Sequence, residues 1–160
     1  SISLTPLLFS FENPNTSPKR QKKTNHGMSV PLLYLTGSEK HAAQLRAYAQ
    51  ALNANWTHSW FETGSKKPDQ PLEWVAAIKR AWKGVLILPH ASDLDDIMFE
   101  LGVMAASNYF VCVLYQDESV RQRLLTFLPR IKVTFYKEFE HLKAHIDRWS
   151  QDLCQADYWD

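Results

Sequence analysis

From residue 30 onward, apolar residues follow two patterns that alternate along the chain. Short apolar-rich runs predict buried strands, and apolar residues spaced three or four apart predict amphipathic helices. The runs predict strands at 32–35, 85–88, 110–115 and 132–136, and alternation of large and polar residues predicts another at 56–60. The helical spacing predicts helices at 39–54, 72–82, 97–107 and from 139 on, a helical or irregular segment at 118–128, and polar loops at 61–71 and 90–96.

The alternation of strands with helices predicts an α/β fold. Continuous apolar strands separated by amphipathic helices are typical of a parallel sheet that is covered on both faces. We therefore expect a flavodoxin-like three-layer sandwich with a five-stranded parallel sheet in the order 2-1-3-4-5. In such sheets ligands bind at the carboxyl ends of the strands, beside the point where the strand order reverses. That rim would contain 36–38, 89–96 and the residues after Tyr115.

The first 27 residues differ in composition from the rest. They are interrupted by three prolines and carry the basic run 19–23. Such a run could be a targeting or phosphate-binding patch, but five residues are a weak signal, so we favour a solvated linker. The globular pattern opens at Met28. We expect a tail or leader at 1–27, with the natural start at Met28, and an α/β domain at 28–160.

Composition narrows the function classes. A formal net charge of +1 provides no global field to gather nucleic acid, and no apolar run approaches the ~20 residues of a membrane-spanning helix. Two cysteines cannot build a disulfide framework, so we expect a reducing, cytoplasmic setting. His141 and His145 lack a third ligand, and neither a P-loop nor a dinucleotide-binding glycine motif is present. We expect no metal, no cofactor, no nucleic acid and no membrane as partners.

The most informative segment is the acidic start of the helix expected at 97–107. Asp93, Asp95 and Asp96 precede it, and Glu100 lies on its first apolar turn. Four carboxylates so close together repel one another and favour raised pKa values, as acid–base or nucleophilic chemistry requires. Helix capping explains Asp95 or Asp96 equally well, but it does not require Glu100. We assign Glu100, Asp93 and Asp95 as candidate catalytic residues.

Two short motifs carry a resemblance to known families. Phe99-Glu100-Leu101-Gly102 resembles the nucleophile helix of the nucleoside 2-deoxyribosyltransferases and their nucleotide N-hydrolase relatives, and Tyr34-Leu35-Thr36-Gly37 resembles their opening strand and turn. The order of elements extends this resemblance over 31–149. The stretch from Asp96 to Gly102 is also similar to bacterial TIR-like nucleotide-binding domains.

Both resemblances imply a glutamate at an N-glycosidic bond. Glu100 would attack or stabilise the anomeric carbon of a ribosyl group. Apart from the resemblances, the position of His90 on the predicted rim suits protonation of the leaving base or simply an exposed loop histidine. Trp60, at the expected strand end, could stack on a base or belong to the core. A nucleoside, a nucleotide or NAD would be the small-molecule partner, and a homo-oligomer is expected. The candidate substrate-binding residues are Tyr34, Thr36, Gly37, Ser38, Trp60, His90, Asp96 and Met104.

Departures from the transferase pattern leave other functions open. Ala76 and Leu94 stand where that family carries aspartates. These differences suit a hydrolase, a TIR-like enzyme that cleaves NAD, or a TIR-like nucleotide sensor. They also suit a module that binds nucleotides or another protein without catalysis.

Overall fold

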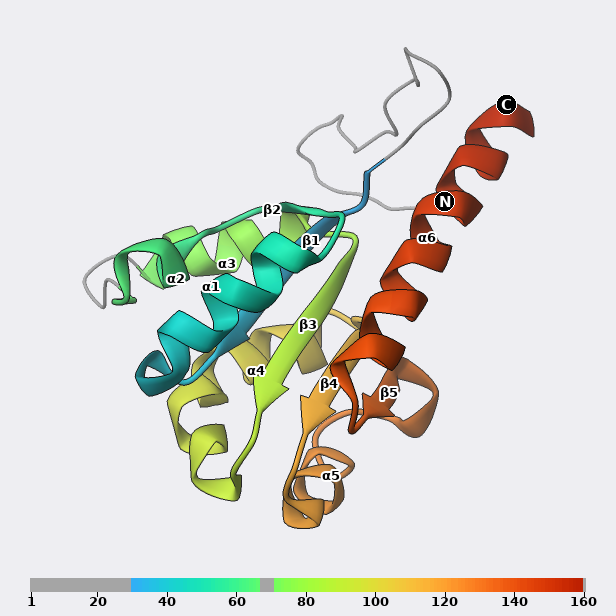
Figure 1. Cartoon of the computed structure of the whole chain (residues 1–160). Helices are drawn as coiled ribbons and strands as arrows, with labels where there is room; N and C mark the ends of the chain where they lie inside the picture. The colour runs from blue at the N-terminus through green and yellow to red at the C-terminus, as the bar shows by residue number, and fades with distance from the viewer. Residues whose placement is uncertain (1–29, 67–70, 160) are drawn as a thin grey trace. The chain divides into compact units, whose positions relative to one another are not determined.

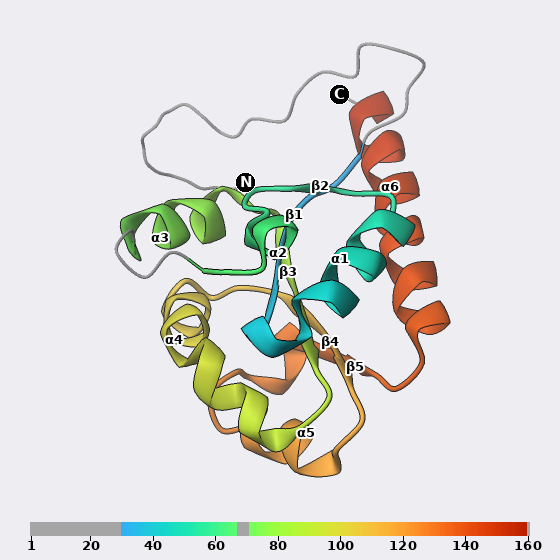
Figure 2. The same ribbon diagram turned by 60° about the vertical axis from the view of Figure 1, so that its left-hand side comes forward.

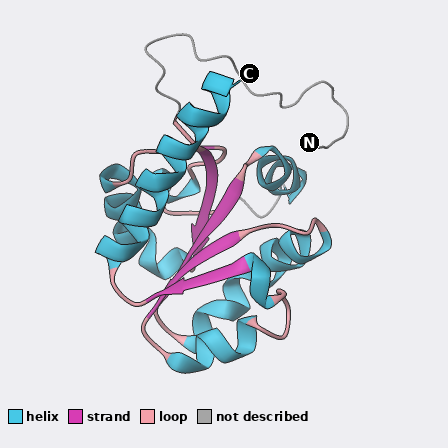
Figure 3. Ribbon diagram, turned by 90° about the vertical axis from the view of Figure 1, so that its right-hand side faces the viewer, coloured by secondary structure: helices cyan, strands magenta, loops and turns pink. Residues whose placement is uncertain are grey.

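A parallel five-stranded sheet in the order β2-β1-β3-β4-β5 forms the centre of the fold, as the sequence predicted. The computed structural model describes residues 30–66 and 71–159. Figure 3 shows the strands running side by side between helices. The strands are β1 Leu32–Gly37, β2 Asn55–Trp56, β3 Lys83–Leu88, β4 Val111–Tyr115 and β5 Val133–Tyr136.

Helices cover both faces of the sheet and produce the expected three layers. In Figures 1 and 2, α3 and α4 lie on one side of the strands, and α1 lies on the other side with the first turns of α6. The helical elements are η1 Glu39–His41, α1 Ala42–Ala51, α2 Trp60–Thr63, α3 Pro71–Arg80, η2 Ala91–Ile97, α4 Met98–Ala106, α5 Glu118–Leu124, η3 Arg130–Lys132 and α6 Phe139–Trp159.

Each face of the sheet has its own apolar core. Successive side chains of a strand point to opposite faces, so Tyr34 joins the core beneath α3, α4 and α5. Its neighbours Leu33 and Leu35 join the core beneath α1, α2 and α6. Because both faces are covered, β1 is buried along nearly its whole length, and this explains its continuous apolar sequence.

Contacts divide the chain into two units. The larger unit is Val30–Trp149, which contains the whole sheet and every residue discussed below. Of the second unit the structure describes residues 150–159, which continue helix α6. The tail expected at 1–27 lies outside the described residues.

Two predicted segments have a different backbone from the one expected. The strand expected at 56–60 ends at Trp56, and Trp60, its last expected residue, begins helix α2, which continues into the expected loop. Trp60 and Phe61 are adjacent, yet both are buried in the same core, which an extended strand could not achieve. The loop expected at 90–96 is largely the 3₁₀ helix η2, because Asp93 accepts a hydrogen bond from the His90 backbone N–H at 2.9 Å and closes its first turn.

The strand order reverses between β1 and β3, at the point where η1 and η2 begin. Gly37, the last residue of β1, pairs with Ile87 of β3. A Cβ at Gly37 would lie 2.5 Å from the Ile87 carbonyl oxygen, so only glycine allows this close approach of the two strands. The residues after both strands therefore meet at one rim, where the sequence placed its candidate site.

Candidate functional site

Glu100 is a buried carboxylate in the first turn of α4, with 1% of the residue exposed. Its Oε2 accepts hydrogen bonds from two side chains of β1, at 2.5 Å from the Tyr34 hydroxyl and at 2.7 Å from Thr36 Oγ1. These donors come from alternate positions of the strand, whose side chains point to the same face. The structure thus joins three candidate residues, of which the sequence had placed Thr36 at the predicted rim.

Tyr34 acts toward Glu100 as a neutral hydrogen-bond donor. Burial, and after it the charge of Glu100, raises the pKa of Tyr34 far above its ordinary value. The phenol therefore keeps its proton throughout the physiological pH range. It fixes one carboxylate oxygen without titrating itself.

Lys66 supplies the positive charge that balances Glu100. Its Nζ lies 2.8 Å from Glu100 Oε1 and 3.2 Å from the Asp96 carbonyl oxygen, and only 5% of Lys66 is exposed. The same ammonium lies 4.9 Å from the centre of the Trp60 ring, a cation–π distance. A buried carboxylate requires such a partner, because removing a lone charge from water is very unfavourable.

The backbone of Lys66 is also held in place. Its N–H donates to Glu39 Oε2 at 2.7 Å, which ties the end of the α2 segment to the first turn after β1. Sequence analysis missed Lys66, since a lysine in a polar loop is ordinarily solvated. The residue is 34 positions from Glu100, and no local motif links the two.

Two further acids of the η2–α4 segment bind the segment that follows β1. Ser38 Oγ donates to Asp96 Oδ2 at 2.5 Å. Asp93, which is fully buried, lies 3.2 Å from His41 Nε2 through one oxygen and 3.3 Å from Lys40 Nζ through the other. Together with the hydrogen bond from Thr36 to Glu100, these contacts hold the segment 36–41 against the segment 93–100, and the two segments run in opposite directions.

Asp95 is the one acid of the cluster that points away from this arrangement. Its side chain is 75% exposed and lies 4.0 Å from Arg123 of α5. The structure therefore brings Asp93, Asp96 and Glu100 onto the β1 side of the rim and leaves Asp95 in solvent. Among the described residues, Asp95 makes no contact with Glu100. Its catalytic role stays a prediction.

The other candidate residues are placed differently from one another. Trp60 is 2% exposed and packs edge-on against Phe61. Met104 is fully buried in the core near Gly84, one turn beyond Glu100. His90 is exposed at the rim, with its ring centre 6.0 Å from that of His41. Their substrate-binding roles stay predictions.

Two further features concern metal binding and membrane insertion. Among the residues that the structure describes, no three histidine, cysteine or acidic side chains gather in a way that could hold a metal ion. Within that same part of the chain, every helix is too short or too polar to span a membrane.

Comparison of the chain with protein-family models, curated proteins and solved structures finds no match. The chemistry of the Glu100 site is therefore the basis for the proposed function.

Proposed function

We propose that this protein cleaves or transfers the N-glycosidic bond of a nucleoside or nucleotide, with Glu100 as the carboxylate at the anomeric carbon. The observation that carries the proposal is a buried carboxylate at the reversal point of a parallel sheet, held through Oε2 by Tyr34 and Thr36 and balanced by Lys66. A preorganised anion suits an oxocarbenium-like transition state, whose positive charge it stabilises.

The proposed chemistry assigns the two carboxylate oxygens different tasks. Among the described residues, Oε2 is anchored by two donors, whereas Oε1 accepts one hydrogen bond and keeps a lone pair. Oε1 forms a bond to C1′ while the C1′–N bond breaks, and the departing base takes a proton from solvent. Water then attacks C1′, loses a proton and releases the sugar, which restores the carboxylate. A second base in place of water gives transfer.

The burial of Glu100 sets a condition on this mechanism. At 1% exposure the carboxylate is not open to a ligand, so substrate binding must displace side chains that now cover it. This condition favours a second candidate function, a nucleotide-binding module in which the pair of Glu100 and Lys66 is structural and no turnover occurs.

Base release tests both candidates. The protein is incubated with a panel of nucleosides, deoxynucleotides and NAD, and free base is measured by chromatography. Glu100→Gln keeps the shape and removes the charge, and we expect it to lower the rate roughly a thousand-fold or more. Glu140→Gln, at an exposed acid of α6, is the matched control.

The substrate that reacts separates the enzyme classes. Release from deoxynucleosides or nucleotides supports the proposal, whereas release of nicotinamide from NAD alone indicates the TIR-like alternative. Equal release by wild type and Glu100→Gln would overturn the role of Glu100. Binding without release from any substrate would favour the binding module.

A further inference from the structure

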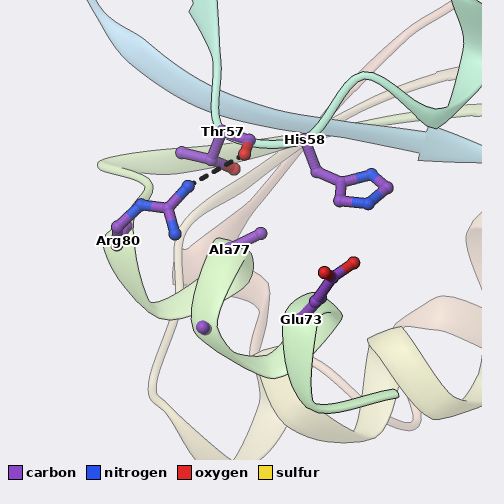
Figure 4. Close-up of a pocket in the computed structure, with 6 residues that line it drawn as sticks. Thr57, His58, Glu73, Ala77 and Arg80 are labelled. Carbon is purple, nitrogen blue, oxygen red and sulfur yellow. Dashed lines mark hydrogen bonds between the residues drawn. The ribbon is translucent and has the colours of Figure 1, made fainter. Parts of the chain in front are cut away.

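A cavity lies away from Glu100, between helix α3 and the segment that follows β2 (Figure 4). Its volume is about 300 Å³, enough for a small metabolite. None of its lining residues is among the hydrogen-bond partners of Glu100. The cavity is lined by Thr57, His58, Glu73, Ala76, Ala77 and Arg80.

One face of α3 forms the floor of this cavity. Glu73, Ala76, Ala77 and Arg80 are spaced three, four and seven apart, so they lie on one side of the helix. Glu73 is in the first turn and Arg80 in the last, about 10 Å apart along the axis. Between them the two alanines present only methyl groups, which leave room for an aliphatic chain.

The two ends of the cavity carry opposite charges. Arg80 Nη2 donates to the Thr57 carbonyl oxygen at 2.9 Å, which fixes the guanidinium at one wall and leaves its other N–H donors for a ligand. The Glu73 carboxylate extends toward the cavity at the opposite end, on the side of His58 (Figure 4). Among the described residues, Glu73 has no hydrogen-bond or ion-pair partner.

A buried hydroxyl at the same wall adds a polar group without a partner. Thr57 Oγ1 is inaccessible to water and forms no hydrogen bond within the described part of the chain. A buried polar atom without a hydrogen-bond partner destabilises the fold. A small rotation of the side chain toward a polar ligand would satisfy it.

We propose that this cavity binds a small zwitterion with a cationic end and a carboxylate end, the chemistry of a basic amino acid. The cationic end pairs with Glu73 and the carboxylate with Arg80, since a bidentate pair of guanidinium and carboxylate is especially strong. The aliphatic stem lies over Ala76 and Ala77. This inference goes beyond the proposed function and does not depend on it.

The test is an NMR titration of the full chain labelled with ¹⁵N. L-Arginine is the probe, up to about 10 mM, a concentration that saturates any site tighter than millimolar. L-Citrulline replaces the guanidinium with a neutral group, and agmatine lacks the carboxylate. We expect L-arginine to shift the backbone amides of the lining residues, and both analogues to bind at least about tenfold more weakly.

Two variants test the two ends of the cavity separately. Glu73→Gln should abolish the preference for L-arginine over L-citrulline, and Arg80→Gln should abolish the preference for L-arginine over agmatine. Glu140→Gln, at an acid in the first turn of α6, is the matched control and should keep both preferences.

Three results would overturn the inference. The first is the absence of any shift at these amides with L-arginine and with L-lysine. The second is equal binding of L-arginine and L-citrulline by the wild type. The third is binding of free adenine at these amides that Glu73→Gln leaves unchanged, which would identify a site for planar bases instead.

Discussion

At the scale of single residues, the pair of Lys66 and Glu100 makes the strongest prediction. Lys66→Met leaves the Glu100 charge buried without its counter-ion, so we expect the free energy of unfolding to fall by about 3–5 kcal/mol. Glu100→Gln leaves the Lys66 charge without a partner and should also destabilise the protein. The double variant buries neither charge and should recover most of the loss. Urea unfolding of the four proteins measures this cycle.

The site around this pair was predicted from the sequence only in part. Tyr34, Thr36 and Glu100 could be predicted as candidate site residues, Thr36 from its place at the rim where adjacent parallel strands end, and Tyr34 and Glu100 from the motifs that contain them. Lys66 could not, because its burial depends on how the turn after α2 packs against Glu39 and Trp60. If the two single variants simply added their effects in the double variant, the interaction inferred here would be absent.

Asp93 and Asp95 differ in burial although they lie two positions apart. Asp93 is fully buried and accepts from the His90 backbone N–H, whereas Asp95 is 75% exposed. We expect Asp93→Asn to lower the free energy of unfolding by about 1–3 kcal/mol and Asp95→Asn to change it by less than about 0.5 kcal/mol. Thermal unfolding compares the two. Equal losses would contradict the contacts described for Asp93.

At the scale of elements, two glycines test how closely strands and helices pack. Gly37→Ala places a Cβ 2.5 Å from the Ile87 carbonyl oxygen, so β1 must move away from β3, and we expect a loss of several kcal/mol. Gly102 lies inside α4 with no atom within 4 Å of an added Cβ. Gly102→Ala should therefore stabilise the protein by about 0.5–1 kcal/mol.

Urea unfolding of both glycine variants shows whether each substitution raises or lowers the free energy of unfolding. A neutral Gly37→Ala would mean that β1 and β3 have more room than the register of Gly37 and Ile87 allows. A destabilising Gly102→Ala would mean that this face of α4 is covered by something outside the described contacts.

The elements also show which sequence signals were sufficient. The strands β1, β3, β4 and β5 carry apolar runs, and their alternation with helices was enough to predict the sheet order. Residues 57–60 were misassigned to the strand that ends at Trp56, because alternation of large and polar residues reports burial and not backbone conformation. Trp60 is buried as the first residue of a helix, although it has the spacing of a strand residue.

At the scale of the whole molecule, a buried thiol and a buried phenol make the free energy of unfolding depend on alkaline pH. Burial raises the pKa of the Cys112 thiol to about 12, and burial raises the pKa of Tyr109 well above its ordinary value. For both groups the folded state favours the neutral form. Their contribution to stability is therefore complete below the unfolded pKa, about 8.5 for cysteine and 10 for tyrosine, and is lost as the pH rises toward the folded value.

This linkage predicts that the free energy of unfolding falls above about pH 9, by up to about 1.4 kcal/mol per pH unit for each such group. Tyr109→Phe isolates one contribution. The Tyr109 hydroxyl is buried and has no hydrogen-bond partner among the described residues, so its removal should cost little at pH 7. Urea unfolding between pH 7 and about pH 11 should then show a smaller alkaline loss in Tyr109→Phe than in the wild type. If the free energy of unfolding fell with pH equally in both proteins, the Tyr109 hydroxyl would ionise as readily in the folded chain as in the unfolded one. Tyr109 would then pack less closely against Gly84 than the structure shows.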